Sequence, residues 1–124
     1  MDAKVLASEI TRIMSEHQLI YAIVNDLDSG KVDAFGDKAK LKYKDLIQTL
    51  FGDGDSIRDL NATLEGQMMP RTWRQGEVAC ILCKPVESAI VGLFYHEHRE
   101  PAESYCFSEE LDAQIGEVWK RLNR

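Results

Sequence analysis

Three short apolar runs constrain the fold more than any other feature of this chain. They comprise residues 19–24, 78–83 and 89–95, and in each run apolar side chains occupy odd and even positions alike. Since successive side chains of a strand point to opposite faces, each run predicts a strand that is buried on both faces. Such strands need a covering layer on each side of the sheet, and amphipathic segments elsewhere in the chain can supply these layers. We therefore expect a sheet between helices.

Size and charge narrow the functional classes. At 124 residues with 44% hydrophobic residues, the chain is expected to form a single domain over residues 1–124. The net charge of −6 disfavours nucleic acid as a partner, because phosphate contacts need clustered Lys and Arg. No apolar run approaches the ~20 residues that cross a bilayer, and the N-terminus lacks the apolar stretch of a signal peptide. These features predict a cytoplasmic protein with no membrane span and three reduced cysteines.

Apolar residues recur at helical spacing in several segments. The expected helices cover residues 3–17, 43–51, about 57–64, and 109–122. Gly52 is expected to stop the second of them. The expected N-caps are Asp2 or a neighbour for the first helix, Asp55 or Ser56 for the short third piece, and Ser108 for the last.

Five strands are expected between these helices, at residues 18–26, 31–37, 67–75, 77–84 and 88–98. Residues 28–31 supply turn chemistry between the first two, with Gly30 able to take a positive φ. Because the most apolar strands belong at the centre, we predict an α+β fold, α-β-β-α-β-β-β-α, with a five-stranded antiparallel sheet of order 2-1-5-4-3. The third strand is then an edge that carries large apolar residues, and such an edge is either covered or used for pairing.

Two pairs of potential metal ligands need weighing. Cys80 and Cys83 have CxxC spacing, but on a strand they point to opposite faces and cannot share a metal ion, which favours a role in the core. His96 and His98 lie on one strand face and can begin a metal site, although spacing specifies no third ligand. A solvated strand end is the simpler interpretation of the histidines.

Two polar segments also need weighing. Residues 53–61 hint at a calcium loop, but Ile57 and Arg58 stand where ligands are needed, so a polar turn with helix capping is favoured. A single basic run is made by Lys38, Lys40, Lys42 and Lys44. This run indicates either a solvated, mobile junction or a contact with phosphate, lipid headgroups or an acidic partner. The chain has no GxSxG motif and no glycine-rich phosphate loop, so we expect no enzyme and no cofactor.

Three features stand out: the order of elements, the turn at residues 28–30 after an apolar strand, and the apolar meander before an amphipathic last helix. In these features the chain resembles the Roadblock/dynein light-chain superfamily, which has a profilin-like fold. The resemblance spans nearly the whole chain, and the polar interruption at residues 52–56 departs from it. It implies a non-enzymatic homodimer or heterodimer that pairs its third strand and second helix across a twofold axis. Many members of this superfamily bind small Ras-like GTPases as scaffolds or regulators in signalling.

Two functional hypotheses follow. The first is a homodimeric interaction module with a small GTPase as a further partner, whose interface contains Tyr43, Ile47, Leu50, Phe51, Met68, Met69 and Trp73. The alternative is a small-molecule-sensing domain of the GAF or PAS type, with a ligand cavity between the sheet and the second helix. Bulky Phe35, Phe94 and Tyr95 leave little spare volume for such a ligand.

Overall fold

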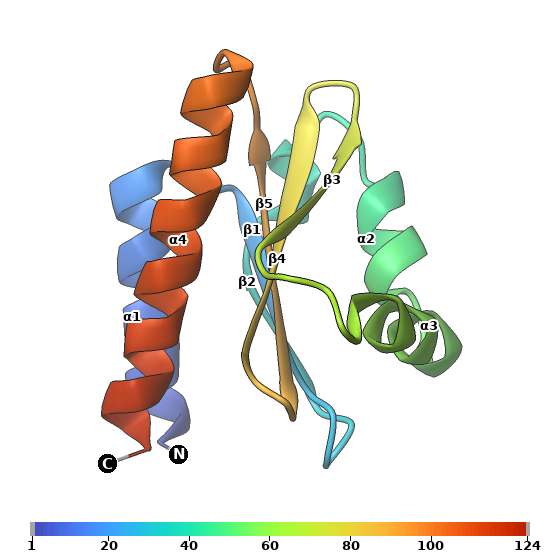
Figure 1. Cartoon of the computed structure of the whole chain (residues 1–124), viewed down its shortest axis with the longest axis vertical. Coiled ribbons are helices and arrows are strands. Elements are labelled where there is room, and N and C mark those ends of the chain that lie inside the picture. The colour runs from blue at the N-terminus through green and yellow to red at the C-terminus, as the bar shows by residue number, and fades with distance from the viewer. Residues whose placement is uncertain (1, 124) are drawn as a thin grey trace.

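A computed structural model of the protein, which describes residues 2–123, has one five-stranded antiparallel sheet with helices on both faces (Figure 1). The helices are α1 (Ala3–His17), α2 (Asp45–Phe51), α3 (Gly54–Leu64) and α4 (Pro101–Leu122), with a short 3-10 turn, η1, at Lys38–Lys40. The strands are β1 (Tyr21–Asp26), β2 (Val32–Gly36), β3 (Arg71–Gln75), β4 (Val78–Val86) and β5 (Ala89–His96). Their order in the sheet, β2-β1-β5-β4-β3, confirms the predicted order.

The sheet separates two hydrophobic cores. Helices α1 and α4 cover one face, and α2 and α3 cover the other (Figure 1). Alternate residues of β4 enter different cores, since Ile81 and Cys83 face α1 and α4 whereas Cys80 and Leu82 face α2 and α3. This arrangement confirms that the two cysteines diverge, and burial raises the pKa of both thiols.

Helix α1 starts and stops where its sequence predicts. The carboxylate of Asp2 accepts hydrogen bonds from the backbone N–H groups of Lys4 and Val5, at 2.8 and 3.3 Å. The helix ends where Gln18 turns into the left-handed region. The start of α1 lies beside the end of α4 at one end of the molecule (Figure 1).

Helix α3 begins earlier than expected. Its N-cap is Asp53, whose carboxylate accepts from the backbone N–H of Ser56 at 2.8 Å. The expectation that Asp55 or Ser56 caps this helix was therefore wrong. Both residues lie inside the first turn, because Gly54 starts the helix directly after the capping aspartate.

Helix α4 also begins earlier, at Pro101 and not at residue 109. Ser108 lies within the helix, and its hydroxyl donates to the carbonyl oxygen of Tyr105 at 2.8 Å, so the prediction of Ser108 as N-cap was wrong. The first two turns place Phe107 in the core but leave Tyr105 exposed, and so lack apolar periodicity. Pro101, at the first helical position, is the signal that marks the true start.

Strand β3 is shorter than expected, because it begins at Arg71 and not at residue 67. Met68 and Met69 therefore precede the strand, and their placement on it was wrong. Pro70 separates them from the strand, and proline has no N–H to contribute to a ladder. The next strand, β4, runs on to Val86, with an irregular register between Cys83 and Val86.

Helix α2 is fixed on the sheet by a close approach to β5. A Cβ atom placed on Gly92 would lie 2.8 Å from Cε2 of Phe51, so only glycine leaves room for this ring. The ring of Phe51 also packs edge-on against Phe94, with 6.3 Å between the ring centroids. This contact sets the position of α2 relative to β5. Within residues 2–123 no helix is long and apolar enough to cross a membrane.

Candidate interaction surface

The candidate surface is built around β3, which forms one edge of the sheet and pairs only with β4. Trp73 lies opposite Cys80, so its side chain shares the face covered by α2 and α3. Thr72 lies opposite Ile81 and faces the side of α1 and α4. The strand therefore presents Arg71, Trp73 and Gln75 on one face, and Thr72 and Arg74 on the other.

The turn between β3 and β4 decides which backbone groups of β3 point outward. It has two residues, and Gly76 occupies the first central position with a φ of +57°, which is typical of a type II′ turn. In such a hairpin the flanking pair, Gln75 and Val78, exchanges both backbone hydrogen bonds. Since the pattern alternates, the N–H and C=O groups of Thr72 and Arg74 point away from β4. They form a short ladder that is open to pairing.

The seven residues of the predicted interface lie at three depths around this edge. Met68 is 87% exposed and Tyr43 is 40% exposed. Ile47, Met69 and Trp73 are half-buried against the core beneath α2 and α3. Leu50 and Phe51 lie deeper, at 5% and 7% exposed, and pack on the sheet of their own chain.

One polar contact ties β3 to α2. The amide Nε2 of Gln75 donates to Oδ2 of Asp45, in the first turn of α2, at 2.7 Å. The other amide atom, Oε1 of Gln75, is buried without a hydrogen-bond partner in the described part of the chain. Sequence analysis missed both residues, because no spacing rule connects positions that are 30 residues apart. Arg71 is exposed, and none of the ion pairs found within residues 2–123 involves it.

One lysine of the basic run, Lys42, meets the two histidines at the end of the sheet that carries the β3–β4 turn. Nζ of Lys42 lies 2.8 Å from Oε1 of Glu77, and the hydrogen bond between them lowers the pKa of Glu77. Nε2 of His96 accepts a hydrogen bond from the backbone N–H of Lys42 at 3.0 Å. Nε2 of His98 lies 3.7 Å from Glu77. No cluster of three or more His, Cys, Asp or Glu suited to a metal ion is found among residues 2–123.

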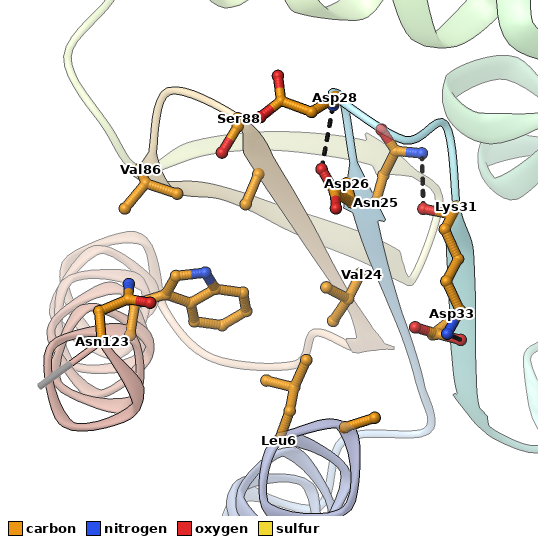
Figure 2. Close-up of a pocket in the computed structure, with 13 residues that line it drawn as sticks. Leu6, Val24, Asn25, Asp26, Asp28, Lys31, Asp33, Val86, Ser88 and Asn123 are labelled. Atoms are coloured by element: carbon orange, nitrogen blue, oxygen red, sulfur yellow. Dashed lines mark hydrogen bonds and ion pairs between the residues drawn. The ribbon is translucent and has the colours of Figure 1, made fainter. Parts of the chain in front are cut away.

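A pocket of about 400 Å³ lies on the other face of the sheet, against α1 and α4 (Figure 2). Leu6 and Val24 line its apolar part. At its rim, Asp26 accepts a hydrogen bond from the backbone N–H of Asp28 at 3.0 Å, so this carboxylate already serves the β1–β2 turn. The GAF-like alternative expects its cavity between the sheet and α2, which is the opposite face.

Comparison with known proteins supports the fold. No protein-family profile matches the chain, and no curated protein matches it by sequence. The solved structure of Myxococcus xanthus MglB matches with a TM-score of 0.60 and 7% sequence identity, over 96% of this chain and 97% of that chain. MglB has a roadblock/longin fold. The chain therefore has a roadblock-type fold, as the sequence resemblance implied.

Proposed function

We propose that this protein is a non-enzymatic, dimeric interaction module that binds a small Ras-like GTPase as a scaffold or regulator. The observation that carries the proposal is the open edge of β3, with Met68 and Tyr43 exposed beside it and Trp73 half-buried on it. This edge belongs to a chain whose fold is similar to that of MglB from end to end.

A second copy of the chain is the proposed partner of this edge. Two β3 strands related by a twofold axis run antiparallel and satisfy each other's outward backbone groups. The apolar side chains beside β3 then leave water together with part of α2. The proposed interface comprises Tyr43, Ile47, Leu50, Phe51, Met68, Met69 and Trp73, with Leu50 and Phe51 supporting it from beneath.

The mass of the purified protein in solution tests the dimer. Light scattering is expected to give twice the chain mass of 14.1 kDa. Trp73→Asp is expected to give the single-chain mass, because it places a carboxylate at the centre of the paired strands. Val32→Asp is the control, since Val32 is an exposed apolar residue on the other edge strand of the sheet, β2. A dimeric Trp73→Asp variant would place the interface elsewhere.

The GTPase part of the proposal rests on the superfamily resemblance and needs its own test. In the dimer, the surface formed by α1 and α4 stays free to hold a partner. Purified Ras-like GTPases, loaded with GDP or with a non-hydrolysable GTP analogue, are to be passed over the immobilised protein. Binding that depends on the nucleotide supports the proposal. No binding in either nucleotide state to the Ras-like GTPases of the same organism contradicts it.

The pocket in Figure 2 is the basis of a second candidate function, small-molecule sensing, although it lies on the face opposite the one that the GAF-like alternative expects. Native mass spectrometry of the purified protein discriminates the two candidates. A monomer that retains a small molecule of fixed mass favours the sensor. A ligand-free dimer favours the interaction module.

A further inference from the structure

We infer that the two copies pair β3 in one register, with Trp73 on the twofold axis and Arg71 of each copy beside Asp45 of the other. This inference rests on the proposed dimer and adds what the dimer proposal leaves open, namely the register and the charged contacts that specify a second copy of this chain as the occupant of the edge.

The backbone selects the register. The outward N–H and C=O groups of β3 belong to Thr72 and Arg74, as the turn geometry requires. With the axis at Trp73, Thr72 of each copy lies opposite Arg74 of the other, and both pairs exchange hydrogen bonds. All the outward groups of the strand are then used.

Neighbouring registers are weaker for identifiable reasons. An axis at Thr72 brings Arg74 opposite Pro70, which has no N–H to donate. An axis at Arg74 brings Thr72 opposite Gly76, which lies in the turn, and sets two guanidinium groups directly against each other. In a register shifted by one residue, the twofold axis lies between two residues. The outward backbone groups of one strand then face residues of the other strand whose backbone groups point inward, and no hydrogen-bond ladder forms.

Charge complementarity agrees with the backbone. In the register centred on Trp73, Arg71 lies opposite Gln75 of the other copy, on the face of α2, where directly opposed Cβ atoms are about 5 Å apart. Gln75 already holds Asp45 at 2.7 Å, so the guanidinium of Arg71 reaches the Asp45 carboxylate of the other copy. Neither Arg71 nor Asp45 takes part in an ion pair within the described residues of its own chain.

The orphaned carbonyl of Gln75 fits the same contact. Its Oε1 atom is buried without a hydrogen-bond partner, and such an atom lowers the stability of the folded state. Arginine carries five N–H donors in a planar fork. A guanidinium that approaches Asp45 over the Gln75 amide can therefore donate to this oxygen as well, after a small rotation of the amide.

Charge reversal tests the pairing of Arg71 with Asp45. Arg71→Glu and Asp45→Arg each place two like-charge pairs in a homodimer, and each is expected to raise the dissociation constant by about tenfold in analytical ultracentrifugation. A mixture of the two variants restores both opposite-charge pairs, so it is expected to form a heterodimer with nearly wild-type affinity. Lys4→Glu, the same charge change on an exposed residue of α1, is the control and is expected to leave the affinity unchanged.

Cysteine cross-linking tests the axis independently. In a background with exposed Cys106 changed to serine, Trp73→Cys is expected to form a disulfide-linked dimer on oxidation with copper phenanthroline, because residues on the axis face each other about 4.5 Å apart between Cα atoms. Thr72→Cys is the matched control and is expected to stay unlinked, since each Thr72 faces Arg74.

The outcomes separate the two proposals. A wild-type monomer overturns the proposed dimer and the register with it. A wild-type dimer in which the two charge variants do not recombine, and in which Trp73→Cys does not cross-link, keeps the dimer and overturns the register. Cross-linking through Thr72→Cys moves the axis and also overturns it.

Discussion

At the scale of single residues, Glu97 shows how one buried carboxylate joins two elements. It follows β5, is 3% exposed, and accepts hydrogen bonds from Oγ of Ser104 at 2.7 Å and from the backbone N–H of Arg99 at 2.9 Å. Burial by itself raises the pKa of this carboxyl, but these hydrogen bonds and the Arg99 charge outweigh burial and hold the pKa below its usual value. The anion thus fastens the first turn of α4 to the end of the sheet.

A pH dependence follows from the lowered pKa of Glu97. Its contribution to stability is fully present above the unfolded-state pKa of about 4.3, and is lost as the pH falls through the lower folded-state value. We expect Glu97→Gln to lower the melting temperature at pH 7 and to lose less stability than the wild type between about pH 5 and 3. Thermal melts over this range, with exposed Glu103→Gln as control, measure the difference. If the melting temperatures of the wild type and Glu97→Gln fell in parallel as the pH was lowered, the stabilising role of the ionised Glu97 would be contradicted.

Gly92 carries a second residue-scale prediction. Gly92→Ala places a methyl group 2.8 Å from Cε2 of Phe51, so it is expected to destabilise the fold by about 1–3 kcal/mol. Gly116→Ala is the matched control, because nothing beyond the local backbone of its own helix lies within 4 Å of its added Cβ. In helix α4 this change is expected to stabilise by about 0.5–1 kcal/mol. Urea unfolding measures both. If the two changes had equal effects on the free energy of unfolding, the packing of Phe51 would not depend on the absence of a side chain at Gly92.

At the scale of elements, the predictable features were those with a local signal. The extent of α1 followed from its apolar stripe and from Asp2, and the sheet order followed from the strands that are apolar at every position. The starts of β3 and α4 depended on Pro70 and Pro101, where no apolar period is present. An edge strand with only Trp73 facing the core gives too little alternation to show where it begins.

The cap of α3 gives a prediction at this scale. Asp53→Ala removes the acceptor for the N–H of Ser56 and is expected to cost about 1 kcal/mol of unfolding free energy. Asp55→Ala, the neighbouring aspartate, loses only an exposed ion pair with Arg58 and is expected to change stability by less than about 0.5 kcal/mol. Chemical denaturation of both variants decides between the two aspartates. A larger loss of stability from Asp55→Ala than from Asp53→Ala would identify Asp55 as the N-cap, as the sequence suggested.

At the scale of the whole molecule, the candidate surface was only partly readable from the sequence. The spacing of α2 predicts an apolar stripe, but cannot say that Leu50 and Phe51 face the sheet while Tyr43 stays exposed. The contact between Gln75 and Asp45 joins two elements, so it appears only once α2 is set against β3. Large apolar residues next to an edge were sufficient to propose where a partner binds, but not in which register.

Dimerisation predicts a stability that depends on protein concentration. Because association favours the folded dimer, the melting temperature of the wild type is expected to rise between micromolar and hundred-micromolar protein. Trp73→Asp is expected to melt at the same temperature throughout this range. Differential scanning calorimetry at matched concentrations measures both, and a wild-type midpoint that does not move would contradict a dimer coupled to folding.

The side-by-side position of the start of α1 and the end of α4 makes the fold a natural candidate for cyclisation. A short flexible linker can join the two ends with little closure entropy, and new ends can be opened at the exposed residues 28–30 of the β1–β2 turn. In such a permutant β1 would be made last and would enter the middle of an already assembled sheet. The order in which the strands arrive during folding could then be changed while β3 and its edge stay as they are.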